Sequence, residues 1–189
     1  MQTSDGKEEP GISDPPEPMP QIDAKMLRAC MGLFVTGVTV VTYLADEKPA
    51  GMTANAFMSV SLDPPLVLVS ARNSSRFNQS VRREVRYGIN FLTETQRPLS
   101  MHFGGRPTDG LEPLFKSERG TPLLEGSLAQ IVARAVDVHP AGDHNLYIGE
   151  VEYIRFGHQE HPLVFYTGKY RQILAHLPHF STNGSTEGW

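Results

Sequence analysis

The chain of 189 residues is long enough for one domain with a sizeable core, and two full cores would be cramped. Its 17 Lys and Arg against 21 Asp and Glu give a formal net charge of -4, which argues against a nucleic-acid-binding role. The single Cys30 cannot form an internal disulfide, and we find neither a signal-peptide pattern nor an apolar run of about 20 residues, so we expect a cytoplasmic protein without a membrane span.

The two ends of the chain differ in composition from its middle. Residues 1–21 combine several prolines with acidic residues, a mixture that buries little apolar surface, and residues 181–189 are rich in Ser, Thr and Gly. We therefore expect a disordered arm at 1–21, one folded domain at 22–180 and a flexible tail at 181–189.

The first predicted elements are a helix and a strand. Asp23 is a suitable N-cap for a helix with one apolar stripe. The stripe consists of Met26, Ala29, Cys30, Leu33 and Phe34. Residues 38–44 are rich in β-branched side chains and predict a strand, which ends at the turn-forming residues 46–49.

The remaining predicted strands are separated by turns that contain Gly, Pro, Asp or Asn. They occupy residues 65–71, 87–92, 130–138, 146–156 and 162–174. Short connecting helices are predicted at 75–85 and 95–103. Six strand runs with few helices between them predict a mainly β fold, an antiparallel barrel with short connecting helices. An α+β arrangement is the alternative, whereas a doubly wound parallel sheet would need a crossover helix between successive strands.

Residues 51–65 are unusual because small and hydroxyl-bearing side chains replace the large apolar ones of a packed strand. The backbone N–H and C=O groups would remain accessible and could hydrogen-bond the edge of a planar heterocycle, with Thr53, Asn55 and Ser59 as side-chain partners. The alternative interpretation is an ordinary loop.

Residues 70–76 pass from a strand end into a helix N-terminus and carry Arg72 and Arg76 among hydroxyl side chains. The free N–H groups of a helix start favour an anion, and a guanidinium adds paired charge-assisted hydrogen bonds. This segment therefore suits a phosphate, and a helix cap with two solvated arginines is the alternative.

Two later segments could contact a ligand. His144 follows Gly142 and Asp143 in a turn between predicted strands, so it should project from a barrel rim, although a solvated turn histidine is the alternative. Residues 165–171 alternate aromatic and polar side chains, and Gly168 permits close approach by another molecule. Core packing is the other explanation for these aromatics.

Several other chemistries lack their sequence signals. Neither G-x-G-x-x-G nor the P-loop pattern occurs, so a nucleotide would have to be bound in another way. His158 and His161 have no cysteine or carboxylate ligands at a zinc-site spacing, and no G-x-S-x-G elbow supports a hydrolase.

Over about residues 25–174 the chain resembles the flavin reductase-like family of FMN-binding split barrels. The resemblance lies in a series of short segments in one order, none of which is decisive alone. These segments are TGVTVVT at 36–42, GMTAN at 51–55, SVSLDPPLVL at 59–68, NFL at 90–92, FGGR at 103–106, GTPLLEGSLA at 120–129, GDH at 142–144 and GEV at 149–151.

The resemblance implies a Greek-key split barrel that forms a homodimer and holds FMN or FAD non-covalently near the subunit boundary. It also implies an NAD(P)H-dependent flavin reductase, with NADH or NADPH as hydride donor, that supplies reduced flavin to a separate flavin-dependent monooxygenase by diffusion or direct contact. Because the flavin itself accepts the hydride, the resemblance assigns no catalytic acid or base.

The family's motifs also imply which residues bind the cofactors. Those expected to line the flavin are Pro49, Ala50, Gly51, Met52, Thr53, Asn55 and Ala56, with His102 and Phe103 as a further contact pair. Those expected on its ribityl and phosphate side are Ser70, Ala71, Arg72, Arg76 and Phe77. Those expected near the nicotinamide are His144, Phe165, Tyr166, Thr167 and Gly168.

Two departures from the family pattern leave the choice of FMN or FAD, and of NADH or NADPH, open. His102 stands where relatives often carry Arg, and Thr167 lies at a position that varies. Two other functions fit the same barrel. A pyridoxamine-phosphate oxidase-like enzyme would retain its flavin and pass electrons to oxygen or an organic substrate, and a non-catalytic redox module would bind flavin without turnover.

Overall fold

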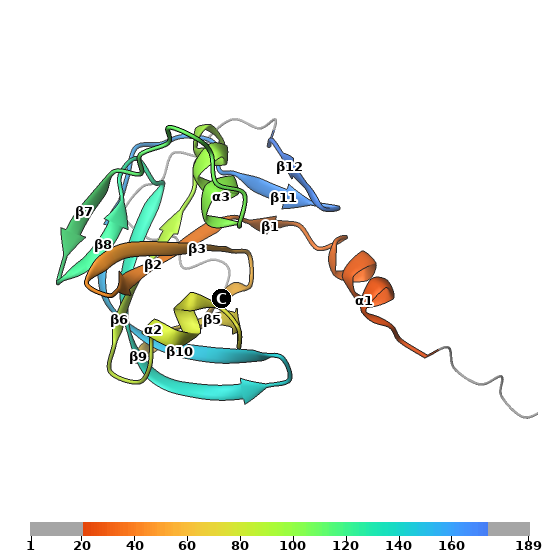
Figure 1. The fold of residues 1–189 in the computed structure, drawn as a ribbon, viewed down its shortest axis with the longest axis horizontal. Helices are drawn as coiled ribbons and strands as arrows, with labels where there is room; N and C mark the ends of the chain where they lie inside the picture. The colour runs from red at the N-terminus through yellow and green to blue at the C-terminus, as the bar shows by residue number, and fades with distance from the viewer. Residues whose placement is uncertain (1–20, 174–189) are drawn as a thin grey trace, which may run out of the picture.

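The computed structural model describes residues 21–173, which form an antiparallel β-barrel with short helices around it (Figure 1). The expected arm and tail lie almost wholly outside the described residues. The helices are α1 (Ala24–Met31), α2 (Arg76–Ser80) and α3 (Arg97–Phe103), the last preceded by a short 3-10 helix, η1 (Glu94–Gln96). No helix within residues 21–173 has the length and apolar character needed to cross a bilayer.

Residues 21–173 contain twelve strands. They are β1 (Thr36–Gly37), β2 (Thr39–Ala45), β3 (Lys48–Ala54), β4 (Phe57–Leu62), β5 (Pro65–Arg72), β6 (Arg86–Phe91), β7 (Phe115–Glu118), β8 (Thr121–Leu124), β9 (Ala129–Ala141), β10 (His144–Phe156), β11 (Val164–Tyr166) and β12 (Lys169–Arg171).

Seven strands form one antiparallel sheet in the order β3-β2-β6-β9-β10-β5-β4. The strands at the two ends of this order, β3 and β4, are consecutive in the chain and are joined by the short turn at Asn55 and Ala56. The sheet must therefore curl until its two edges approach each other, which produces a split barrel rather than an open sheet. Strands far apart in the sequence become neighbours, as β2 and β6 do, in the manner of a Greek key.

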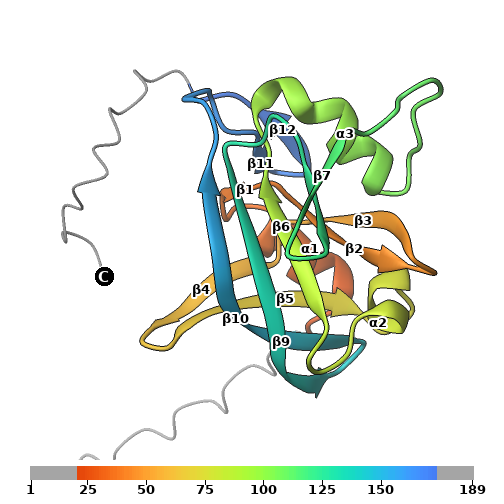
Figure 2. The ribbon, with the colours of Figure 1, turned by 90° about the vertical axis from the view of Figure 1, so that its left-hand side faces the viewer.

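The longest hairpin joins β9 and β10 (Figure 2). Gly142 takes the first turn position with a φ of 63°, which glycine adopts without strain and which a two-residue hairpin turn requires. Beyond the turn, His144 pairs with Arg72 of the neighbouring strand β5. The hairpin thus brings the predicted rim histidine beside a predicted phosphate-binding arginine.

The main core lies inside the barrel, and α2 contributes an aromatic side chain to it. Phe77 is fully buried and meets the rings of Tyr43, Tyr87 and Tyr147 edge-on, with centroids 5.3, 5.6 and 4.8 Å away. Edge-to-face pairs of this kind contribute about 0.5–1.5 kcal/mol each beyond the burial of their area. The position of the short helix α2 is therefore set largely by one ring.

A second core lies on the other face of β2, under α3 and the β7–β8 and β11–β12 hairpins. It contains Val38, Val40, Leu92, Leu124 and Leu163. Because β2 is covered on both faces, its sequence is almost continuously apolar and β-branched instead of alternating.

The predicted mainly β antiparallel barrel is confirmed, and each predicted strand region contains strand. Residues 162–174 do not form one strand, however, but contain the β11–β12 hairpin, because Thr167 and Gly168 adopt φ values of 50° and 74° and reverse the chain. The helix predicted at 75–85 ends at Ser80, since Val81 is already extended and buried in the core.

The structure of two further segments differs from the prediction. Most of residues 51–65, whose composition suggests accessible backbone or a loop, belongs to the barrel-edge strands β3 and β4 and to the start of β5. The β7–β8 hairpin is absent from the predicted elements because its four-residue strands are too short to show a clear alternation.

Candidate functional site

Strand β3 and helix α3 form the first part of the candidate site. A Cβ atom at residue 51 would lie 2.9 Å from the ring of Phe103, so only glycine allows this close approach of β3 and α3. Two residues further along, the Thr53 hydroxyl donates to the Ser100 carbonyl at 2.7 Å and ties β3 to the middle of α3. The backbone around Gly51 is therefore held in a defined position.

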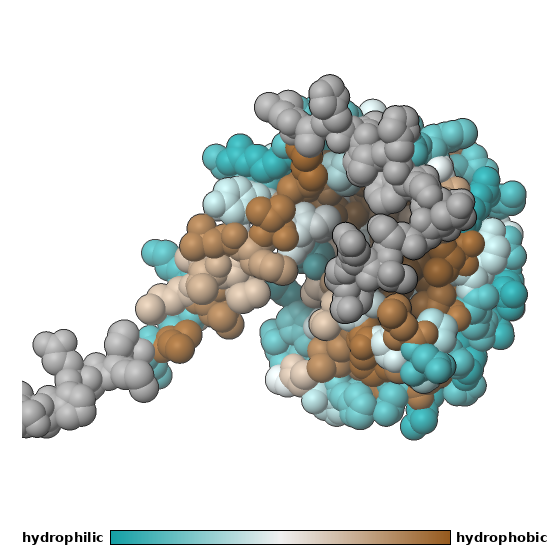
Figure 3. Space-filling view, turned by 180° about the vertical axis from the view of Figure 1, so that it is seen from behind, coloured by the Kyte–Doolittle hydropathy of each residue, from teal (hydrophilic) through white to brown (hydrophobic). Residues whose placement is uncertain are grey.

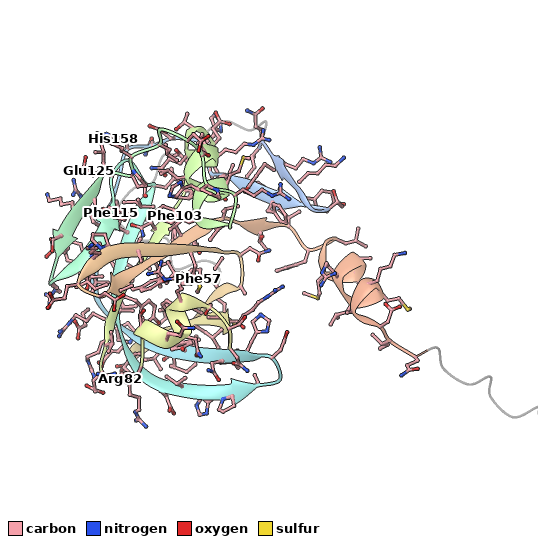
Figure 4. The ribbon with its side chains drawn as sticks, viewed as in Figure 1. Phe57, Arg82, Phe103, Phe115, Glu125 and His158 are labelled. Carbon is pink, nitrogen blue, oxygen red and sulfur yellow. The ribbon has the colours of Figure 1, made fainter. Side chains whose placement is uncertain are left out.

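His102 and Phe103 end α3 beside this strand. The Nδ1 atom of His102 is buried and has no hydrogen-bond partner among the described residues. Leaving a buried polar atom unpaired costs about 1–3 kcal/mol, so His102 is a candidate contact for the polar edge of a bound molecule. Figure 4 shows Phe103 close to Phe115, whose ring centroid lies 6.3 Å away, so the end of α3 is anchored by aromatic packing.

The end of β5 and the start of α2 form the second part. The Ser75 hydroxyl caps α2 by accepting from the Asn78 amide at 3.2 Å, and it donates to the Arg72 carbonyl at 2.7 Å. Arg72 and Arg76 are exposed, and no ion pair among residues 21–173 includes either of them. Two guanidinium groups without ion pairs thus lie at the start of a helix, an arrangement that favours an anion.

The β9–β10 tip borders this anion site. His144 and Arg72 are cross-strand partners, so their side chains lie on the same face of the sheet. The His144 Nδ1 atom lies 2.7 Å from an Asp143 carboxylate oxygen. This hydrogen bond lowers the pKa of Asp143, and the carboxylate orients the imidazole.

The β11–β12 hairpin is anchored elsewhere. The Thr167 amide donates to the Gly32 carbonyl just after α1 at 2.8 Å, and the Tyr170 and Ser100 hydroxyls hydrogen-bond at 2.8 Å. Figures 1 and 2 both show this hairpin at the opposite end of the barrel from the β9–β10 tip. Although the family motifs imply that His144 and Tyr166 both approach the nicotinamide, the structure does not bring them together within one chain.

Some predicted site residues can offer only backbone groups. Phe77 and Ala71 are 0% and 2% exposed, and both side chains belong to the barrel core. Ala50 and Met52 also pack against that core, because side chains alternate along β3. The Thr53 hydroxyl already donates its hydrogen to α3, so toward a ligand it can only accept.

Two polar residues that support the site, Ser100 and Asn78, were not predicted from the sequence. Ser100 is fully buried in α3, and Asn78 of α2 bonds both to β10 and to the loop before α2. The signal for Ser100 is a hydroxyl residue on the apolar face of the predicted helix 95–103. No comparable signal exists for Asn78, because its partners are distant in the sequence.

Fold and site together define a class of split β-barrel whose rim suits a molecule with a polar ring edge and an anionic group. Residues 31–174, most of the chain, match a family model described as "Flavin reductase like domain". The chain belongs to this family.

Proteins similar to this chain carry matching names. An NADH-dependent flavin reductase from Rhodococcus sp is 44% identical over 157 residues, covering 82% of this chain and 89% of its own. The reductase subunit HsaB of a flavin-dependent monooxygenase from Mycobacterium tuberculosis is 38% identical over 157 residues, covering 81% of this chain and 84% of its own. The solved structure of the flavin reductase PheA2 superposes with a TM-score of 0.75 at 41% identity, covering 82% of this chain and all of that one.

Proposed function

We propose that this protein is a flavin reductase in which NADH transfers hydride to a non-covalently held FMN or FAD, which then leaves in its reduced form. The observation that carries the proposal is the rim where His144 lies beside Arg72 and the start of α2, with both arginines free of ion pairs among the described residues. Membership of the family and the name of the Rhodococcus relative support NADH as the donor.

The residues at this rim and along β3 suit a flavin nucleotide. Arg72, Arg76 and the first amides of α2 would hold its phosphate. The backbone of residues 49–56 and the unpaired Nδ1 atom of His102 would contact the polar edge of its ring. His144, oriented by Asp143, would contact the donor, and no side chain is required as an acid or base.

The reduced flavin would pass to a separate flavin-dependent monooxygenase. The exposure of Arg72 and Arg76 supports this proposal, because a phosphate held at the exposed surface can dissociate into the solvent. The relative HsaB is itself named as the reductase subunit of such an enzyme. Since NADH is a metabolite of the cell interior, the proposed location is the cytoplasm.

We further propose a homodimer. The helix α1 has no buried residue, although its apolar side chains and those just after it gather on the surface, brown in Figure 3. A second apolar row, Met58, Val60 and Leu62, is exposed on the barrel-edge strand β4. A partner chain would bury such surfaces, and its β11–β12 hairpin could then approach the cofactor held beside His144.

The test is oxidation of NADH and NADPH by the purified full-length protein with catalytic or stoichiometric FMN, FAD or riboflavin. Many turnovers with freely exchanging flavin and a preference for NADH are the expected result. Turnover with a retained flavin and an organic substrate would favour the pyridoxamine-phosphate oxidase-like alternative. Flavin binding without NADH oxidation would favour the redox module.

A further inference from the structure

Asn78, near the middle of α2, makes side-chain hydrogen bonds to two segments outside the helix, strand β10 and the loop before α2. Its amide oxygen accepts from the Tyr147 hydroxyl and from the Asn145 side chain, each at 2.5 Å, both on strand β10. Its Nδ2 group donates to the Asn73 carbonyl at 3.0 Å, in the loop before α2. One side chain therefore holds the loop to the strand.

The same loop is bonded directly to the β9–β10 tip. The Asn73 amide donates to the Asp143 carbonyl at 3.0 Å, and the Asn73 side chain donates to the Gly142 carbonyl at 3.3 Å. The backbone N–H and the side chain of Asn73 thus bond the hairpin tip. The Asn73 carbonyl accepts the hydrogen bond from Asn78. The segment that carries Arg72 and the tip that carries His144 share one hydrogen-bond network anchored by Asn78.

Neither capping nor core packing of α2 requires these contacts. Ser75 supplies the N-cap, and the buried Phe77 supplies the packing against the barrel. The Asn78 side chain is half-buried and uses both of its polar atoms on segments outside the helix. These bonds join the arginine-bearing loop to strand β10, in addition to the backbone pairing of β5 with β10.

We propose that Asn78 is a positioning residue for hydride transfer, which it serves by fixing His144 relative to the segment that contains Arg72 and Arg76. This inference rests on the proposed reductase function. The network itself needs no cofactor, however, so its presence and its catalytic consequence can be measured separately.

Three variants separate the possibilities. Asn78→Leu keeps the approximate volume but removes all three side-chain hydrogen bonds, and Tyr147→Phe removes one of them while Asn145 still bonds Asn78. Val81→Ala is the matched control, because it weakens the core contact of the residue after α2 without touching the network. Thermal unfolding of all three first establishes that each variant is folded.

The first measurement is amide hydrogen exchange of the cofactor-free protein. We expect the backbone N–H of Asn73 to exchange about tenfold faster in Asn78→Leu, which is the equivalent of one lost hydrogen bond. The increase in its exchange rate should be smaller in Tyr147→Phe. In Val81→Ala its protection should stay close to that of the wild type. Unchanged protection of Asn73 in Asn78→Leu would overturn the proposed network.

The second measurement is single-turnover reduction of FMN by NADH, with the FMN and riboflavin affinities determined separately. Asn78→Leu should slow the hydride step by about 10- to 100-fold, because misplacing the reacting groups by up to about 1 Å has an effect of this size. The variant protein should also lose part of the wild-type preference for FMN over riboflavin. Val81→Ala should keep the wild-type rate. An equal slowing in both variants, or wild-type rates in Asn78→Leu, would overturn the positioning role. Wild-type protein that reduces no flavin would overturn the proposed function and this role together, while the exchange data would still report on the network.

Discussion

Arg76 is exposed in the first turn of α2 and forms no ion pair with the other described residues. If it binds a phosphate, Arg76→Ala should weaken FMN and FAD by about tenfold or more but leave riboflavin, which lacks the phosphate, nearly unaffected. Fluorescence titration of the three flavins measures this difference. Arg82→Ala, which removes a second exposed arginine just beyond the helix, is the control, and equal weakening of all three flavins by Arg76→Ala would assign Arg76 a structural role.

Tyr87 carries a hydroxyl group that is buried without a hydrogen-bond partner in the described structure. Its oxygen faces Gly149 so closely that a Cβ atom there would overlap it. Because phenylalanine would remove an unsatisfied polar group and keep the ring packing, Tyr87→Phe should raise the free energy of unfolding by about 1 kcal/mol. Tyr147→Phe, which loses a hydrogen bond to Asn78, should lower it. Urea unfolding measures both variants, and equal destabilisation of the two would contradict this explanation.

At the scale of elements, Asn90 joins three strands through a buried side chain. Its Nδ2 group donates to the Val40 carbonyl at 2.9 Å and to the Thr42 hydroxyl at 3.0 Å, and its oxygen accepts from the Leu124 amide at 2.8 Å. The short β7–β8 hairpin is held against β2 and β6 by this group and by the bond from the Thr42 hydroxyl to the Pro122 carbonyl.

Asn90→Leu should therefore lower the free energy of unfolding by about 3 kcal/mol or more, since it leaves the Leu124 amide and other polar groups buried without partners. Ser127→Ala, in the turn that follows this hairpin, is the control. It removes a hydrogen bond to the Leu124 carbonyl, which Gln130 still contacts. The free energy of unfolding should therefore fall by less than about 1.5 kcal/mol. Urea unfolding measures both, and similar losses would show that Asn90 has no special role.

At the scale of the whole molecule, the buried tyrosines set how the barrel responds to alkaline pH. Burial raises the pKa of Tyr43, Tyr87 and Tyr147 above the usual value of 10.0. Above pH 10 the unfolded chain loses protons that the folded barrel keeps, so the free energy of unfolding should fall by up to about 1.4 kcal/mol per pH unit for each tyrosine. Below pH 9 these groups should contribute no slope.

Chemical denaturation between pH 7 and pH 11 tests this response, and Tyr87→Phe supplies the comparison because it removes one of the three groups. The variant should show a shallower alkaline slope than the wild type. A slope that is identical in both proteins would mean that Tyr87 does not carry the effect.

The proposed homodimer makes a prediction at the same scale. Met58 and Val60 are 55% and 45% exposed on β4, and a double change to Glu would place two charges in the apolar row. If this row lies in the subunit interface, the variant should be a monomer by light scattering, while the wild type is a dimer. Arg119→Glu alters the net charge by the same amount on the exposed β7–β8 turn and should stay dimeric. Two dimeric variants would place the interface elsewhere.

Much of the barrel could be predicted because local chemistry determines it. The β-branched run at 38–44, the glycine turn before His144 and the Asp23 N-cap each act through neighbouring residues, and the structure contains the corresponding strand, hairpin and helix. Exposure of Arg72 and Arg76 at a helix start also follows from local sequence. These features depend on alternation, capping and turn conformation, which a single segment carries within itself.

Tertiary structure alone decided which of these segments meet. The sheet order pairs β5 with β10 and so brings Arg72 to His144, while the β11–β12 hairpin with Tyr166 goes to the other end of the barrel. Burial of Phe77 and the bonds of Asn78 likewise depend on strands far along the chain. The physical reason is that closure of the barrel selects the hydrogen-bond and packing partners, and no local pattern specifies that closure. The local sequence therefore determined the type of each element, and the tertiary fold determined which residues make up the site.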